Sequence, residues 1–366
     1  MSAKALTRKL VATAGFLIAV CWLWPDTGSA TPLIQSTLGT SGPGNFAILG
    51  LGGVNVTDTD LTLNGPGQTL GNVGVASTGN IALNSSTPPA IIGNLFLGNT
   101  ATTSGSAGGC NPPGAGCNQI SGTTFFNQDV FLNGAVADAL AANALFNSNA
   151  GMFTVDQTIS GNITSSQTLQ CAAGDTVCVI LVTGNVQLGN NDILTLNGTT
   201  AGESFILEVA GNITLNGGNN FSGGQIRLGG TLDSSDDAVI KAQKVSTGDN
   251  VTASGGSSNP CSAASQGNLG TTLGAVLCPG GIDTGNTLPN AFIQGILLDT
   301  QGGVGFSPGM VIGEIIGGGN EIRLVSGSQV INNVQATTGV PAPATVLLLG
   351  GGLVGIGFLR NVLRRR

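Results

Sequence analysis

The sequence contains no histidine and no tyrosine among its 366 residues, and only 8% of its residues are charged. The absence of histidine excludes a Ser-His-Asp triad, a Cys-His dyad and a histidine zinc site. Aromatic residues make up 4% of the chain, so a core has to be built mainly from aliphatic side chains. The low charge content does not fit a disordered chain, which combines high net charge with low hydrophobicity.

Basic residues are scarce and gather at the two ends of the chain. The sequence has 11 basic and 18 acidic residues. Only four of the basic residues lie between positions 10 and 359, namely Arg227, Lys241, Lys244 and Arg323. A protein trimmed at both ends would therefore be strongly acidic, which argues against nucleic acid as a partner. We also expect no cofactor.

Glycine is abundant, with 61 residues, and has no collagen-like period. It recurs in a Gly-Asn-aliphatic step before short alternating strands, at Gly71-Asn72-Val73, Gly79-Asn80-Ile81, Gly93-Asn94-Leu95, Gly161-Asn162-Ile163, Gly184-Asn185-Val186 and Gly211-Asn212-Ile213. Glycine and asparagine tolerate a positive φ, which suits corners between strands. The last three steps are 23 and 27 residues apart, about one coil of a parallel β-helix. Residues 31–339 are therefore predicted to form an all-β domain, a parallel β-helix, with a β-sandwich as the alternative.

One segment departs from the strand pattern. Residues 135–146 are rich in alanine and place Val136, Leu140 and Ala144 at helical spacing. This predicts a single helix that lies against the solenoid or caps one of its ends.

The first 30 residues have the pattern of a secretory signal peptide. Three basic residues precede an apolar run at 10–24, and small residues at Gly28, Ser29 and Ala30 suit a cleavage site. An N-terminal membrane anchor is the alternative.

The last 27 residues, 340–366, combine a proline-rich motif, an apolar run and a basic end. Val340, Pro341, Ala342 and Pro343 precede an apolar stretch at 344–359, which we expect to form a membrane helix, and basic residues follow at Arg360, Arg364, Arg365 and Arg366. This tail resembles the PEP-CTERM protein-sorting signal of Gram-negative bacteria, except that Ala342 stands where that family has glutamate. The resemblance implies recognition by an exosortase-type transpeptidase and an association with exopolysaccharide. A plain tail anchor is the alternative.

Six cysteines follow the signal peptide in three local pairs, which are Cys110 with Cys117, Cys171 with Cys178, and Cys261 with Cys278. Six cysteines allow 15 connectivities, and we expect pairing between nearest neighbours. Their spacings do not match a zinc site, whereas disulfides suit an exported protein.

The middle of the chain shows a second resemblance, carried by residues 45–50, by the alanine-rich helix and by residues 292–297. It is similar to the ice-binding-like family of secreted β-solenoids, and its end to the related choice-of-anchor A domains. The resemblance implies a discontinuous right-handed β-helix with one helix packed alongside. Ice binding would require threonines that repeat on every coil, but Thr57, Thr59 and Thr62 and then Thr195, Thr199 and Thr200 form clusters without such a repeat.

Three groups of acidic residues are candidates for catalysis or for weak calcium binding. They are Asp58 with Asp60, Glu203 with Glu208, and Asp233 with Asp236 and Asp237. The last group lacks the spacing of an EF-hand loop, so a solvated turn is the favoured interpretation and no metal is expected. We therefore expect an exported, non-catalytic bacterial surface or matrix protein that contacts exopolysaccharide. The alternatives are an ice- or glycan-binding adhesin module and a polysaccharide-active enzyme.

Overall fold

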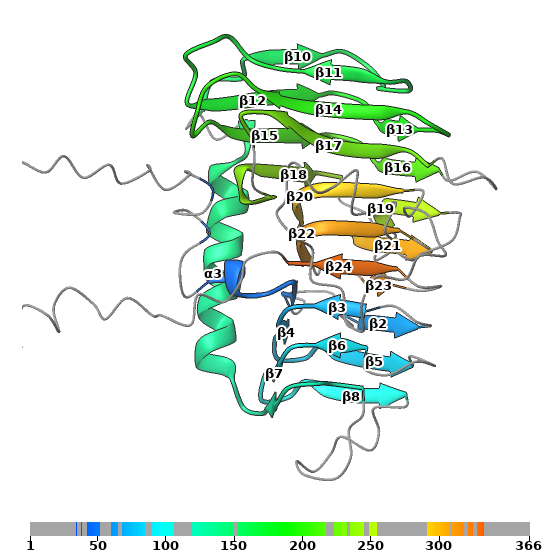
Figure 1. Ribbon diagram of the computed structural model, residues 1–366. Helices are drawn as coiled ribbons and strands as arrows, with labels where there is room; N and C mark the ends of the chain where they lie inside the picture. The colour runs from blue at the N-terminus through cyan, green and yellow to red at the C-terminus, as the bar shows by residue number, and fades with distance from the viewer. Residues whose placement is uncertain are drawn as a thin grey trace, which may run out of the picture.

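In a computed structural model, the chain forms a stack of parallel β-strand coils with one helix along its side (Figure 1). The structure describes residues 34, 38, 42–51, 60–64, 68–84, 90–105, 119–148, 153–216, 223–232, 235–244, 249–254, 291–307, 309–317, 321–324 and 328–332. The predicted signal peptide, the tail at 340–366, Asp58, Asp233 and four of the six cysteines (Cys110, Cys117, Cys261 and Cys278) lie outside these residues. Among the described residues no helix is long and apolar enough to cross a membrane, and the expected span at 344–359 is not among them.

Each coil contributes strands to three faces of the stack. Face 1, which the helix covers, contains β10 (Gln157–Ile159), β12 (Val177–Val182), β15 (Ser204–Val209), β18 (Ala238–Ala242), the second halves of β20 (Phe292–Asp299) and β22 (Met310–Gly317), β1 (Ile48–Gly50), β4 (Val73–Val75), β7 (Leu95–Leu97) and β9 (Thr124–Phe125). Face 2 contains β11 (Gln167–Leu169), β14 (Ile193–Gly198), β17 (Gln225–Gly230), the first halves of β20 and β22, β24 (Gln329–Ile331), β3 (Gln68–Leu70) and β6 (Ile91–Ile92).

Face 3 is a separate eight-stranded sheet. Its strands, in spatial order, are β13 (Val186–Leu188), β16 (Ile213–Asn216), β19 (Asp249–Ser254), β21 (Gly303–Ser307), β23 (Ile322–Leu324), β2 (Asp60–Asn64), β5 (Asn80–Asn84) and β8 (Thr102–Gly105). Every pairing in both sheets of the described chain is parallel, for example β12 with β15 and β16 with β19. The predicted parallel β-solenoid is confirmed, and the alternative β-sandwich, which needs antiparallel pairs, is wrong.

The order of the coils in space differs from their order in the sequence. The chain starts in the middle of the stack at β1 and moves to the lower end at β9 (Figure 1). Helix α3 (Asp129–Leu145) then leads to the upper end, and the coils from β10 to β24 descend until β22 pairs with β1 and β24 pairs with β3. Strands β24, β1 and β2 thus complete one coil from the two ends of the folded chain.

The seam between these two ends is closed by direct bonds. The backbone N–H of Asn332 donates to Leu70 O at 3.0 Å, and its side-chain amide donates to Phe46 O at 3.2 Å. A 3-10 turn, η1 (Pro43–Asn45), precedes β1 and contacts α3. The domain therefore begins and ends at one place, in the middle of its long side.

Helix α3 is the predicted helix, but it begins six residues earlier than the expected start at Ala135. Its small buried residues, Ala135, Ala139 and Ala142, let it lie close against face 1. The outward side chains of face 1, such as Val179 and Ile206, are buried beneath it in a second apolar cluster, outside the core of the coils. The alanine pattern alone does not mark the first two turns, because those turns contain bulkier residues and Gly134.

The Gly-Asn steps lie at corners of the coils, as the sequence predicts, and their asparagines form ladders. Asn185 N–H donates to Asn162 Oδ1 at 2.8 Å, and Asn212 N–H donates to Asn185 Oδ1 at 2.8 Å. The glycine beside each asparagine makes the close stacking possible. A Cβ on Gly211 would lie 2.2 Å from Asn185 Oδ1 and 2.7 Å from Gly184 O.

We expect Asn185→Ala to lower the free energy of unfolding by about 1–3 kcal/mol, because the N–H of Asn212 loses its acceptor at a partly buried corner. Urea denaturation measures the change. Asn190→Ala, in an exposed turn of the same coil, is the matched control and should cost less than about 0.5 kcal/mol. Equal effects of the two substitutions would contradict a stabilising ladder.

Candidate functional site on face 3

The register of face 3 places one residue per coil in a continuous row. The row is formed by Gln187, Thr214, Thr252, Gly305, Arg323, Thr62, Ala82 and Ser104. Neighbouring strands lie about 4.8 Å apart, so the row extends over roughly 30 Å. Two positions further along the strands, Asn216, Ser254 and Ser307 share a second register row, and Asn64 and Asn84 pair in the same way lower in the stack.

Alternation along the strands turns this row away from the core. On β16, Ile213 and Leu215 are fully buried, whereas Thr214 between them is half-buried. Gln187 and Arg323 are exposed at their places in the row. Thr252 Oγ1 donates to Thr214 Oγ1 at 3.5 Å, so the hydroxyls of neighbouring coils lie side by side. Five residues of the row are therefore uncharged and polar, and Gly305, Arg323 and Ala82 occupy the other three positions.

This row agrees with the expectation that threonines do not recur on every coil, because threonine occupies three of its eight positions. Thr214, Thr252 and Thr62 occupy one register position, although Thr214 and Thr252 are 38 residues apart in the sequence. The other predicted threonines are placed elsewhere. Thr195 lies on face 2, Thr199 and Thr200 lie in a corner loop, and Thr57 and Thr59 are outside the described residues.

Face 2 is less uniform than face 3. Its row begins with polar residues, Thr168 paired with Thr195 and Thr195 with Arg227. Lower in the stack, the same face contains Ile312 and Ile331. Both are buried, and neither belongs to the two apolar clusters. Face 1 is covered by α3, so face 3 is the candidate binding surface.

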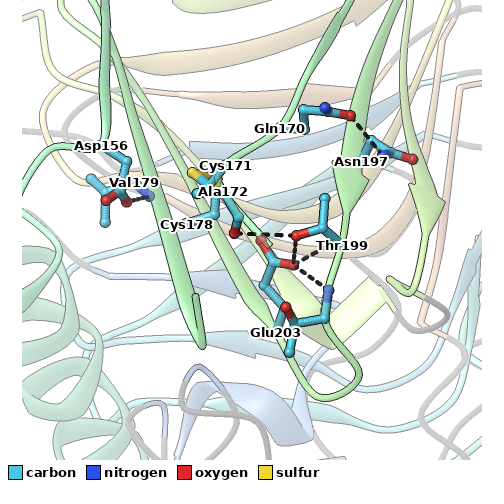
Figure 2. Close-up of a disulfide and its surroundings, with 10 residues drawn as sticks. Asp156, Gln170, Cys171, Ala172, Cys178, Val179, Asn197, Thr199 and Glu203 are labelled. Atoms are coloured by element: carbon cyan, nitrogen blue, oxygen red, sulfur yellow. Dashed lines mark hydrogen bonds between the residues drawn. A yellow bond between two sulfur atoms is a disulfide. The ribbon is translucent and has the colours of Figure 1, made fainter. Parts of the chain in front are cut away.

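The acidic pair Glu203 and Glu208 does not form a common site. Glu203 is buried in a corner loop, where its Oε2 accepts the N–H groups of Thr199 and Thr200 at 2.6 and 2.9 Å (Figure 2). Glu208 projects from β15 on face 1, and its Oε2 accepts the N–H of Ser148 at 2.9 Å near the end of the helix. Each of these carboxylates binds backbone groups of its own surroundings.

Asp236 and Asp237 lie in a 3-10 turn, η4 (Ser235–Asp237), and only 8% and 5% of their surfaces are exposed. The favoured interpretation as a solvated turn is therefore wrong. Burial, together with the charge of Asp237, raises the pKa of Asp236 to about 6. Within the described ranges, no three Cys, Asp or Glu side chains come together as metal ligands.

The nearest-neighbour pairing is confirmed for the cysteine pair that the structure describes. Cys171 and Cys178 form a disulfide across the corner between β11 and β12, close to the upper end of the stack (Figure 2). A disulfide of this kind is typical of proteins that fold in an oxidising compartment.

Two solved structures of an ice-binding protein (LeIBP) from an Arctic yeast are similar to this chain. The first covers 83% of this chain and 96% of that chain, with 17% sequence identity and a TM-score of 0.47. The second, of the glycosylated protein, covers 87% and 98% at 15% identity and a TM-score of 0.35. No family model and no curated protein sequence matches the chain. The assignment of the fold rests on the strand pairing described above.

Proposed function

We propose that this chain is an exported, non-catalytic surface or matrix protein that binds exopolysaccharide along face 3. The observation that carries the proposal is the register row across the eight strands of that face, in which five of the eight residues are uncharged and polar. A glycan chain offers hydroxyl groups repeatedly along its length. The hydroxyl and amide groups in this row can meet them with several weak hydrogen bonds, each worth about 0.5–1.5 kcal/mol.

Export is supported by the signal-peptide pattern at 1–30 and by the disulfide between Cys171 and Cys178. The tail at 340–366 supports sorting at the inner membrane of a Gram-negative bacterium by an exosortase-type transpeptidase. In this proposal, cleavage near Pro343 releases the solenoid to the cell surface or the extracellular matrix. The bonded roles of Glu203 and Glu208 support a non-catalytic function, because a glycosidase needs two acids that flank one substrate.

The test of this proposal is binding to purified exopolysaccharide of the producing organism. Thr252→Glu places a bulky charge in the centre of the row, and we expect it to weaken co-sedimentation with the polysaccharide by at least about tenfold. Val130→Glu is the matched control, because Val130 is 93% exposed on the helix at the other side of the stack. If the unsubstituted chain binds the polysaccharide and both variants bind it equally well, the assignment of the binding site to face 3 is overturned.

Ice is the second candidate ligand, and a specific observation favours it. Three of the eight residues in the row are threonines, and the hydroxyls of Thr214 and Thr252 lie side by side on adjacent strands. Partitioning into a slowly growing ice hemisphere distinguishes the two ligands. Suppose that the protein enters the ice, that Thr252→Glu abolishes this, and that the protein does not bind the polysaccharide. The ligand of face 3 would then be ice and not a glycan.

A further inference from the structure

The upper end of the stack presents open strand edges. Strand β10 pairs only with β12, and β11 pairs only with β14 among the described residues (Figure 1). Their side chains are not covered: Gln157, Thr158, Gln167 and Thr168 are all exposed. An uncovered strand edge carries backbone N–H and C=O groups that can pair with another strand.

The backbone polarity of β10 can be assigned from its bonds to the coil below. The carbonyl of Ile159 accepts the N–H of Thr183 at 3.0 Å, so the polar groups of Ile159 point down towards β12. Successive residues of a strand direct these groups to opposite sides. Both the N–H and the C=O of Thr158 therefore point away from the stack.

Strands β10 and β11 and the turn between them lack charged residues and proline, and the carboxylate of Asp156, directly before β10, accepts the N–H of Val179 in the coil below. Residues 157–170 contain no lysine, arginine, aspartate, glutamate or proline. Natural edge strands are protected by charged side chains, by proline, by bulges or by a covering segment. The edge is also held in shape, because the disulfide at Cys171 fixes the corner that follows β11, and Asp192 Oδ1 accepts the N–H of Ser166 at 3.2 Å.

We propose that two copies of this chain associate head to head through this upper end, with β10 pairing antiparallel to β10 of the second copy. A two-fold axis through Thr158 places this residue opposite its own symmetry mate. Two residues that face each other in this way exchange both N–H···O bonds, which is the hydrogen-bonded pair of an antiparallel ladder. A two-fold axis closes the assembly at a dimer. This surface is separate from face 3, so the inference does not depend on the ligand of that face.

Analytical ultracentrifugation of the folded, exported protein over a range of concentrations tests the proposal. The expected result is a reversible monomer–dimer equilibrium. Thr158→Lys, which adds two like charges at the dyad, should raise the dissociation constant at least about tenfold. Thr158→Pro, which removes the outward N–H without breaking a bond to β12, should have the same effect.

Val130→Lys is the control, because it adds the same charge at an exposed helix position far from this end. The proposal is overturned if the protein stays monomeric at all concentrations, or if Thr158→Lys and Val130→Lys dimerise equally well. Growth beyond the dimer would overturn the two-fold arrangement in favour of head-to-tail stacking. Circular dichroism of each variant shows that a loss of association is not a loss of folding.

Discussion

Replacement of Lys241 by methionine is expected to lower the free energy of unfolding by about 3–5 kcal/mol. Lys241 is 2% exposed between the solenoid and the end of α3. Its Nζ donates to Asn143 O at 2.8 Å and lies 3.8 Å from Oε1 of Glu208, which is fully buried. Burial lowers the pKa of Lys241, and the charge of Glu208 opposes that shift. The substitution leaves Glu208 buried without its counter-charge, which is the costly part of the change.

The position of Lys241 also explains why its replacement should destabilise the end of α3. The last carbonyl groups of a helix lack partners within the helix and carry a partial negative charge. Lys241 supplies a cation there, from a strand 98 residues further along the chain. At the other end, Asp129 Oδ1 accepts the hydroxyl of Ser77 and the N–H of Asn99. The two contacts fix α3 to coils from opposite halves of the stack.

Urea denaturation and hydrogen exchange of α3 measure this prediction. The matched control is Lys244→Met on the same segment, which is exposed and should cost less than about 0.5 kcal/mol. A double variant, Glu208→Leu with Lys241→Met, removes both charges and should recover most of the lost stability. The prediction fails if Lys241→Met costs no more than Lys244→Met, or if the double variant is as unstable as the single one.

The coil architecture could be predicted from the sequence because its signals are local. A Gly-Asn step followed by an alternating strand indicates a corner and a half-buried face at any place in the chain. The order of the coils could not be predicted. Strand β1 pairs with β22, and nothing in the two short aliphatic segments, Ile48–Gly50 and Ile315–Gly317, distinguishes this partner from the other short aliphatic strands.

The row on face 3 could not be predicted from the sequence for a related reason. Thr252 follows Thr214 after 38 residues, and β21 follows β19 only after the long connection from Ser254 to Phe292, so the row has no constant period. The burial of Asp236 could not be predicted from the sequence either. A run of Asp and Ser is typical of an exposed turn, and here the turn is buried because it contacts β20 and β22, which come later in the chain.

The same buried turn predicts that the domain loses stability as the pH rises through about 6. Glu314 is fully buried on β22, and burial, followed by the charge of Asp236, raises its pKa well above the usual value, although a hydrogen bond from Asn332 opposes the shift. Its Oε1 accepts the Asn332 amide at 3.3 Å, and within the described chain its Oε2 has no hydrogen-bond partner. The unfolded chain releases the protons of both acids near pH 4.

Between about pH 4 and the raised pKa values, the folded state therefore holds more protons than the unfolded state, and its stability falls as the pH increases. For Asp236, with a folded pKa of about 6, the loss between about pH 4 and pH 8 is on the order of 3 kcal/mol. Glu314 adds to this loss at higher pH. Because Glu314 shares Asn332 with the seam between the two chain ends, the weakening should begin where β22 meets β1.

Urea denaturation at about pH 4, 6 and 8 gives the slope of stability against pH. Asp236→Asn and Glu314→Gln should each flatten that slope, and glutamine at 314 keeps an acceptor for the Asn332 amide. Asn190→Ala, which changes no titratable group, is the control and should leave the slope unchanged. A slope that stays the same in both variants would mean that other groups carry the pH dependence. A flatter slope in Asp236→Asn alone would assign the loss to η4 and exclude a contribution from the seam.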